Sequence, residues 1–264
     1  MRIPGTVAIV TGGARGLGKA FSEELLKRGG KVCIADVNVT EGQQTEQIFK
    51  QKYGEDTSMF MKCDITNETD FKGLWKAAIK KFKYVDLMVN NAGILNEQEP
   101  NKTVEINLLG VMRGTMIAIE HMRKDRGGKG GLIINVSSTA GLFPVFFMPS
   151  YAASKYGVVG FTRSWAANPL VNEFGLSFAC LCPAFSDTNM LTDTVDVDEP
   201  PLITYKQNKE TVDGIIGGLG VNTVEDVTNA FVELVENPDN NGAVVTVEKK
   251  RGPRYRFKDH PHKL

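Results

Sequence analysis

Short runs of β-branched and apolar residues alternate along this chain with longer segments whose apolar positions recur at helical spacing. The first run, TVAIV, starts at residue 6 and precedes a helical segment near 16–29, and the alternation continues to GAVVTVE near the end. Several runs are apolar on consecutive residues, which is typical of strands covered on both faces. Strands separated by helical crossovers predict βαβ units and therefore a parallel sheet.

The complete pattern predicts an α/β fold: a Rossmann-type, doubly wound parallel sheet of about seven strands with helices on both faces. The strand candidates are TVAIV, KVCIAD, SMFMKC, YVDLMVN, GGLIINVSS, GLSFACLC and GAVVTVE, and the helical segments lie near 16–29, 40–53, 67–83, 100–124, 151–172 and 223–236. A length of 264 residues fits a single domain, 1–264.

Two segments depart from the alternation. Residues 184–222 are rich in Asp, Pro and Gly, and we expect them to form a lid or substrate loop. Its apolar residues Phe185, Met190 and Leu191 predict an inner face, and the acids Asp193, Asp196, Asp198 and Glu199 predict a wetted outer face. The tail 249–264 is strongly basic. We expect this tail to be solvated, and the alternative is contact with RNA, an anionic membrane surface or an anionic substrate.

Composition excludes several classes of function. The chain has 31 Lys and Arg against 31 Asp and Glu, so there is no net field to attract nucleic acid as the main partner. The most apolar stretch, 141–149, is too short to span a bilayer, so we expect no stable membrane insertion. Four scattered cysteines favour a reducing compartment, and we expect a cytoplasmic protein. Cys180 and Cys182 lie two apart, but with only three histidines we expect no metal site.

A glycine loop follows the first strand and opens directly into a helix. Its glycines Gly12, Gly16 and Gly18 let the backbone approach a pyrophosphate, whose charge suits the positive end of the helix. Asp36 ends the next strand, 18 residues after Gly18, where a carboxylate reaches the adenosine ribose. Asp36 would repel a 2′-phosphate, so we expect NAD rather than NADP; Arg15 is the residue that could bind that phosphate instead.

Four further residues predict acid/base chemistry. Tyr151 and Lys155 lie four apart in a helical segment and therefore on one face. We expect the Lys155 ammonium to lower the pKa of the Tyr151 phenol toward the range of a general base. One strand ends in Ser137 and Ser138 at the edge of the sheet where ligands bind, and one of these hydroxyls could hold the substrate oxygen beside Tyr151. Asn107 could anchor a water in a proton path. Each residue alone has an ordinary structural explanation.

Together these residues resemble the short-chain dehydrogenase/reductase family, of the type with a Tyr-x-x-x-Lys motif. The matching positions are Thr11-Gly12, Gly16, Gly18, Asn90-Asn91-Ala92-Gly93, Asn107, Ser138, Tyr151 and Lys155, and the match spans nearly the whole chain. One departure is Ala184, where the family usually has glycine after Pro183; the residue stays small, so we expect the loop to be kept.

The resemblance implies an NAD-dependent enzyme that transfers hydride to or from a carbinol carbon. Tyr151 would act as acid/base, Ser138 would orient the substrate oxygen, Lys155 would also bind the nicotinamide ribose, and Asn107 would complete a proton relay. Asp64 would contact adenine and Thr188 the carboxamide. The implied cofactor residues are Gly12, Arg15, Gly16, Leu17, Gly18, Asp36, Val37, Asp64, Ile65, Asn91, Ala92, Gly93, Tyr151, Lys155, Ser186 and Thr188. The family also implies a homodimer paired through the helices near 100–124 and 151–172.

Within the family, the chain is most similar to the group that contains hydroxyprostaglandin dehydrogenases and insect alcohol and photoreceptor dehydrogenases. Prostaglandin-oxidising members have a glutamine three residues before the tyrosine, where this chain has Met148. We therefore expect Ser138, Met148 and Phe185 to contact an apolar alcohol or carbonyl, either a hydroxy-eicosanoid or a retinoid. Met148 could instead only pack beneath the lid. The alternatives are a dehydrogenase of small secondary alcohols and, in another class, a non-catalytic NAD-binding sensor.

Overall fold

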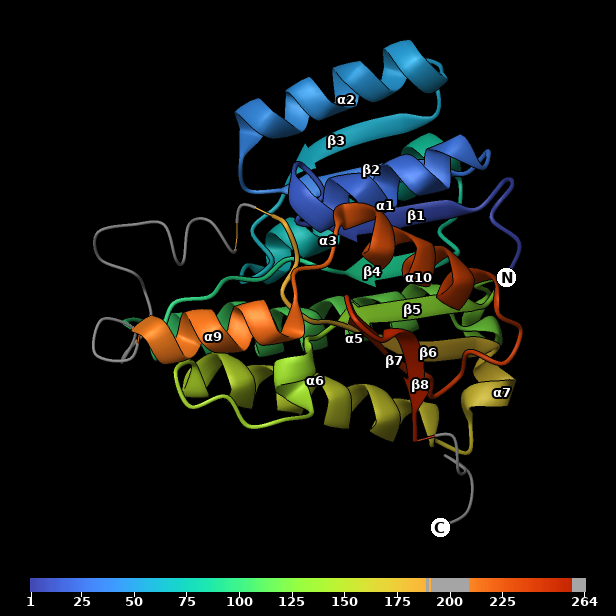
Figure 1. Cartoon of the computed structure of the whole chain (residues 1–264). Coiled ribbons are helices and arrows are strands. Elements are labelled where there is room, and N and C mark those ends of the chain that lie inside the picture. Colours follow the sequence, from blue (N-terminus) through green and yellow to red (C-terminus); the bar gives the residue numbers. More distant parts are fainter. Residues whose placement is uncertain (189, 191–208, 258–264) are drawn as a thin grey trace.

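The computed structural model describes residues 1–188, 190 and 209–257. Its centre is an eight-stranded sheet in the order β3-β2-β1-β4-β5-β6-β7-β8 (Figure 1). The strands from β1 to β7 pair in parallel, which confirms the doubly wound α/β fold. The strands are β1 Val7–Thr11, β2 Lys31–Asp36, β3 Ser58–Lys62, β4 Leu87–Asn90, β5 Gly131–Val136, β6 Leu176–Pro183, β7 Val244–Glu248 and β8 Gly252–Arg256.

Helices connect these strands and cover both faces of the sheet. They are α1 Gly16–Lys27, α2 Val39–Tyr53, α3 Glu68–Phe82, α4 Pro100–Val104, α5 Val111–Met122, α6 Pro149–Ala166, α7 Val171–Phe174, α9 Lys209–Leu219 and α10 Val224–Glu236, with a π-helical turn η1 Glu105–Gly110 and 3-10 turns η2 Lys124–Arg126 and η3 Thr139–Gly141. In the described part of the chain, no helix is long and apolar enough to cross a bilayer.

Successive residues of the strands enter two separate cores, because side chains alternate across a sheet. In β1, Ala8 and Val10 pack against apolar side chains of α1, α2 and α10, such as Phe21 and Phe231. The alternate residues of β1 pack against α3, α5 and α7 on the other face. Burial on both faces explains why the strands read as consecutive apolar runs.

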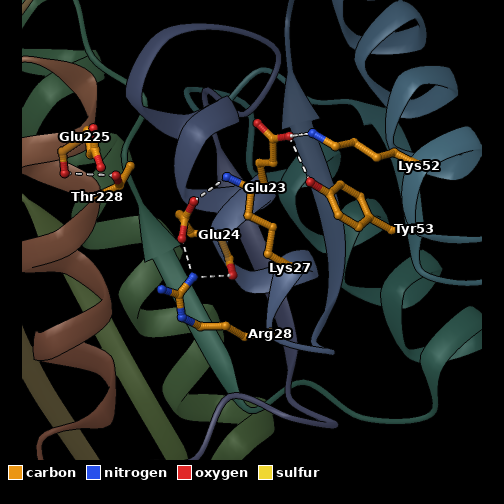
Figure 2. A network of polar contacts seen from close by, with 8 residues as sticks. All are labelled: Glu23, Glu24, Lys27, Arg28, Lys52, Tyr53, Glu225 and Thr228. Carbon is orange, nitrogen blue, oxygen red and sulfur yellow. Dashed lines mark hydrogen bonds and ion pairs between the residues drawn. The ribbon is translucent and has the colours of Figure 1, made fainter.

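On the outer surface, polar side chains connect α1 to α2. Glu23 accepts hydrogen bonds from the Lys52 ammonium at 2.6 Å and from the Tyr53 hydroxyl at 2.8 Å (Figure 2). Glu24, one residue later, pairs instead with Lys27 and Arg28 of its own helix end. The Glu23 contacts therefore join the C-terminal end of α2 to α1.

The sheet has one strand more than the sequence predicts. Strand β8 runs antiparallel to β7, with Val245 opposite Tyr255, and it lies inside the segment that we expected to be a solvated tail. The sequence GPRYR contains a proline and two arginines, which an edge strand tolerates. Because these residues are unusual inside a sheet, the sequence does not predict a strand here. The prediction of a wholly solvated tail is therefore wrong for residues 252–256, and residues 258–264 lie outside the described residues.

Helix boundaries also differ from the predictions. The predicted helix near 100–124 is divided into α4, η1 and α5. The predicted helix near 151–172 corresponds to α6, which ends at Ala166, and to the start of the short helix α7. The segment 184–222 contains helix α9, which we did not predict because glycine has a low helix propensity and α9 contains three glycines. Of the predicted lid residues, Leu191, Asp193, Asp196, Asp198 and Glu199 lie outside the described residues.

Candidate active site

The glycine loop between β1 and α1 leaves no room for a side chain at Gly12 or at Gly18. A Cβ on Gly12 would lie 2.9 Å from the Cα of Ala92, and a Cβ on Gly18 would overlap the carbonyl oxygen of Gly12. Gly12 and Gly16 also have positive φ angles, 61° and 53°. Only glycine fits these positions without strain, so the loop packs directly against the backbone that follows β4.

The carboxyl ends of β1 and β4 are joined by side-chain hydrogen bonds. The hydroxyl of Thr11 accepts hydrogen bonds from the amides of Asn91 at 3.0 Å and Ala92 at 3.1 Å. The amide side chain of Asn91 donates to the carbonyl of Thr11 at 2.9 Å. Since the strand order reverses between β1 and β4, this is the crevice where doubly wound folds bind ligands.

A cavity of about 420 Å³ opens beside this crevice. Its lining contains most of the predicted cofactor residues, namely Gly12, Arg15, Gly16, Leu17, Asp36, Val37, Asp64, Ile65, Asn91, Ala92, Gly93 and Thr188. Gly18 lies beneath the loop, and Ser186 lines the neighbouring cavity instead. The structure thus brings together residues that are far apart in the chain.

Three features of this cavity fit a dinucleotide. The first turn of α1 has no acidic residue and no side-chain cap, so its amides can receive an anion. The Asp36 carboxylate accepts hydrogen bonds from the amides of Ala14 at 3.1 Å and Asn38 at 3.0 Å, which holds it at the cavity. The Val37 side chain is 58% exposed and offers an apolar surface there. Arg15 lies 3.8 Å from Glu41, so its charge is partly matched.

A second cavity, of about 430 Å³, adjoins the first and shares Leu17, Gly93 and Thr188 with it. Tyr151 and Lys155 of α6 line it, and so does Ser138, which follows β5 and caps η3. The Ser138 hydroxyl donates to the carbonyl of Pro183 at 3.3 Å and accepts from the amide of Ala140 at 3.2 Å. The predicted serine, tyrosine and lysine therefore line one cavity.

Burial shifts both ionisable groups away from their charged forms. It raises the pKa of Tyr151 to about 12, although a hydrogen bond with Ser138 acts in the opposite direction. Burial lowers the pKa of Lys155 to about 8. The ammonium nitrogen of Lys155 donates to the carbonyl of Val136 at 3.1 Å and lies 5.5 Å from the centre of the Tyr151 ring. The pKa of Tyr151 is therefore not lowered in the free protein as expected, because desolvation by burial is the largest influence on it.

Asn107 is fully buried in the π-helical turn η1, a distortion that is frequent at functional sites. Its side chain accepts from the amide of Ile94 and donates to the carbonyl of Ile94, both at 2.8 Å. A Cβ on Gly93 would lie 3.1 Å from the Asn107 oxygen and 3.5 Å from the Lys155 nitrogen. Asn107 is therefore next to Lys155, and its amide braces the loop after β4.

The second cavity is mainly apolar away from Ser138 and Tyr151. Met148 and Phe185 line it as predicted, together with Phe143, Val145, Phe146, Phe147, Ile215, Ile216 and Leu219. Met148 is buried in a small cluster with Phe147 and Tyr151, so it both packs and faces the cavity. Arg251 and Glu248 also line the cavity and form an ion pair at 3.3 Å.

Cys180 and Cys182 are buried in β6 with their sulfur atoms 3.6 Å apart, and both are free thiols. Their position on one face of the strand agrees with the sequence pattern. Among the residues that the structure describes, no group of three His, Cys, Asp or Glu side chains is arranged to hold a metal ion.

A further residue next to the site was also not predicted. Glu97, in the loop after β4, accepts hydrogen bonds from the amides of Ser150 and Tyr151. A sequence signal for it did exist: α6 begins at Pro149 after Met148, with no side chain suited to an N-cap. Without a capping side chain at Met148, the first amides of α6 need a hydrogen-bond acceptor from elsewhere in the chain. The sequence does not show which residue supplies it.

Comparison with known proteins agrees with this geometry. The family model "short chain dehydrogenase" matches residues 6–198. The chain is 35% identical to human 15-hydroxyprostaglandin dehydrogenase (NAD(+)) over 259 residues, covering 98% of this chain and 97% of the human one. It is 39% identical over 129 residues to alcohol dehydrogenase 1 of Ceratitis cosyra, covering about half of each.

A solved structure has the same fold. The crystal structure of a short-chain dehydrogenase/reductase from Burkholderia phymatum in complex with NAD superposes with a TM-score of 0.79 at 23% identity, covering 93% of this chain and 90% of that one. The fold and the site thus define an oxidoreductase with a dinucleotide crevice. The chain belongs to the short-chain dehydrogenase family.

Proposed function

We propose that this protein is an NAD-dependent dehydrogenase that interconverts an apolar alcohol and its carbonyl compound. The observation that carries the proposal is the junction of the two cavities. Ser138 and Tyr151 line an apolar cavity that shares Leu17, Gly93 and Thr188 with the cavity that Asp36 lines. A substrate oxygen on the hydroxyls of Ser138 and Tyr151 would place its carbon toward the crevice.

The cofactor fits the residues that are present. Asp36 would bind the adenosine ribose and exclude a 2′-phosphate, and the first turn of α1 would bind the pyrophosphate. Lys155 and Thr188 would contact the nicotinamide half. When bound, NAD supplies the hydride acceptor for alcohol oxidation. The related protein named 15-hydroxyprostaglandin dehydrogenase (NAD(+)) supports the same choice of cofactor.

In the proposed mechanism, Ser138 and Tyr151 hold the substrate oxygen by hydrogen bonds. Tyr151 removes the hydroxyl proton when the alcohol is oxidised and returns it in the reverse direction. Burial favours the neutral phenol, which is the form that donates a proton to a carbonyl oxygen in the reductive direction. Oxidation needs the phenolate, which the buried charge of Lys155 stabilises when the lysine is protonated. Asn107 would hold the inner end of the proton path.

The apolar walls favour a lipid-like substrate, and a hydroxy-eicosanoid is the first candidate because of the 35% identity to the human prostaglandin enzyme. A retinoid is the second candidate, since Met148 supplies no hydrogen bond to a second polar group. Small secondary alcohols would leave much of the cavity unfilled. A non-catalytic NAD sensor would have no chemical need for Ser138, Tyr151 and Lys155 in one cavity.

The segment 184–222 is proposed to act as the substrate lid. Phe185 and Ser186 at its start and Ile215, Ile216 and Leu219 of α9 line the apolar cavity. The protein is further proposed to be a cytoplasmic homodimer. The exposed apolar side chains of Leu109, Met116 and Tyr156 on η1, α5 and α6 support pairing through these helices, and the four free thiols support a reducing compartment.

A substrate panel tests the proposal. Purified protein with NAD is offered a prostaglandin, all-trans-retinol and short secondary alcohols, and the formation of NADH is followed by absorbance. Turnover of a lipid alcohol with little turnover of the short alcohols is the expected result. Tight NADH binding without turnover of any alcohol in the panel would instead support the sensor function.

A further inference from the structure

The carboxylate of Glu97 lies at the N-terminus of α6 and is only 3% exposed. One of its oxygens accepts a hydrogen bond from the amide of Tyr151 at 2.7 Å, and the other accepts from the amide of Ser150 at 2.9 Å. A buried carboxylate is costly unless its hydrogen bonds are satisfied. Here both carboxylate oxygens of Glu97 accept a hydrogen bond, one from the amide of Tyr151 and the other from the amide of the residue before it, Ser150.

The first turn of α6 has no other source for these bonds. Pro149 has no amide hydrogen, and Met148 at the N-cap forms no side-chain hydrogen bond. The amide of Ala152 already donates to the carbonyl of Met148 at 2.9 Å. The amides of Ser150 and Tyr151 are thus the two that need an external acceptor, and the positive end of the helix favours an anion there.

The loop that carries Glu97 is itself fixed to the site. Asn107 holds it through both hydrogen bonds to Ile94, and the hydroxyl of Thr103 donates to the carbonyl of Asn96 at 2.6 Å. The same loop begins with the residues that close the dinucleotide crevice. A continuous series of contacts therefore runs from Asn107 through Ile94 and Glu97 to Tyr151.

We propose that Glu97 is a positioning residue: its carboxylate fixes the backbone of Tyr151 relative to the dinucleotide crevice, so that the phenol stays beside Ser138. This inference rests on the proposed function for its effect on turnover, but the contact that it describes exists in the free protein. Glu97 does not line either cavity, so it has no direct contact with substrate or cofactor.

The test combines hydrogen exchange with kinetics on Glu97→Ala and Glu97→Gln. In the free protein, exchange of the amides of residues 149–152 should be faster in Glu97→Ala than in wild type. Exchange in Glu97→Gln should be intermediate, because a carboxamide has one acceptor oxygen instead of two. Turnover per NADH-binding site should fall by about 100-fold in Glu97→Ala, because a small displacement of a reacting group has an effect of this size. The affinity for NADH should be unchanged.

A matched control is Thr223→Ala, which removes the side-chain cap of α10 on the opposite face of the sheet. It should lower thermal stability without changing turnover per NADH-binding site. The proposal is overturned by unchanged exchange in both Glu97 variants, or by turnover per NADH-binding site equal to wild type. If Glu97→Ala does not fold, the near-isosteric Glu97→Gln decides. If wild type oxidises no alcohol, the proposed function fails, while the exchange measurement still decides whether Glu97 holds Tyr151.

Discussion

The ammonium nitrogen of Lys155 donates a hydrogen bond to the carbonyl of Val136 and lies 5.5 Å from the centre of the Tyr151 ring. The two groups are close enough to interact electrostatically, yet the lysine is bound to the backbone of β5 and not to the phenol. Burial therefore dominates: it raises the pKa of Tyr151 and lowers the pKa of Lys155, so that both groups favour their uncharged forms.

Lys155 makes stability depend on pH in a defined window. Its pKa falls from 10.5 to about 8 on burial. Between these values the unfolded chain binds a proton that the folded chain has lost, so the free energy of unfolding rises with pH. Relative to Lys155→Met, we expect wild type to gain on the order of 3 kcal/mol across this window. Urea denaturation of both proteins at a series of pH values measures this gain, and a constant difference would argue against a buried, neutralised lysine.

The preference for NAD depends on Asp36. In Asp36→Ala the repulsion of a 2′-phosphate disappears, so the ratio of kcat/KM for NAD to that for NADP should fall at least about tenfold. Glu46→Gln is the control, because it removes a carboxylate of α2 that pairs with Lys50 and does not line the cavity. A ratio that stays constant in Asp36→Ala and changes in Arg15→Ala would assign the selectivity to Arg15.

The glycine loop predicts a steric effect. Gly18→Ala places a Cβ against the carbonyl of Gly12, so it should destabilise the protein by about 1–3 kcal/mol and weaken NADH binding. Gly214→Ala is the matched control, because a Cβ at this exposed helical glycine meets nothing within 4 Å. It should be neutral or stabilise by up to about 1 kcal/mol. Thermal unfolding measures the stability of the two variants, and titration measures their affinity for NADH. Equal stability and equal NADH affinity of Gly18→Ala and Gly214→Ala would contradict the close packing of the glycine loop.

Substrate choice can be tested at Met148. In Met148→Gln, an amide would face the cavity, so the ratio of kcat/KM for a hydroxy-eicosanoid to that for retinol should rise about three- to tenfold, the worth of one hydrogen bond. Met148→Leu keeps the position apolar and should leave the ratio unchanged. If Met148→Gln also leaves the ratio unchanged, recognition depends on the lid segment.

The sequence was sufficient to predict the interior of this fold and many of the residues that line its two cavities. The consecutive apolar runs of β1 to β7 and the glycine loop follow directly from burial and from backbone geometry. Strand β8 was not predicted, because it contains Pro253 and two arginines, which only an edge strand tolerates. Helix α9 was not predicted, because the glycines of GIIGGL are typical of a loop. The pKa direction of Tyr151 and the role of Glu97 depend on which distant residues surround them, and no local pattern encodes that.

In the proposed mechanism, Tyr151 transfers the proton at a site that binds NAD independently of it. The most direct test is Tyr151→Phe, measured for both turnover of the best alcohol in the panel and NADH affinity. We predict a loss of turnover of about 10²- to 10⁴-fold with NADH binding unchanged, as expected when a general acid/base is removed from an intact site. Substantial turnover by this variant, at wild-type NADH affinity, would contradict the account.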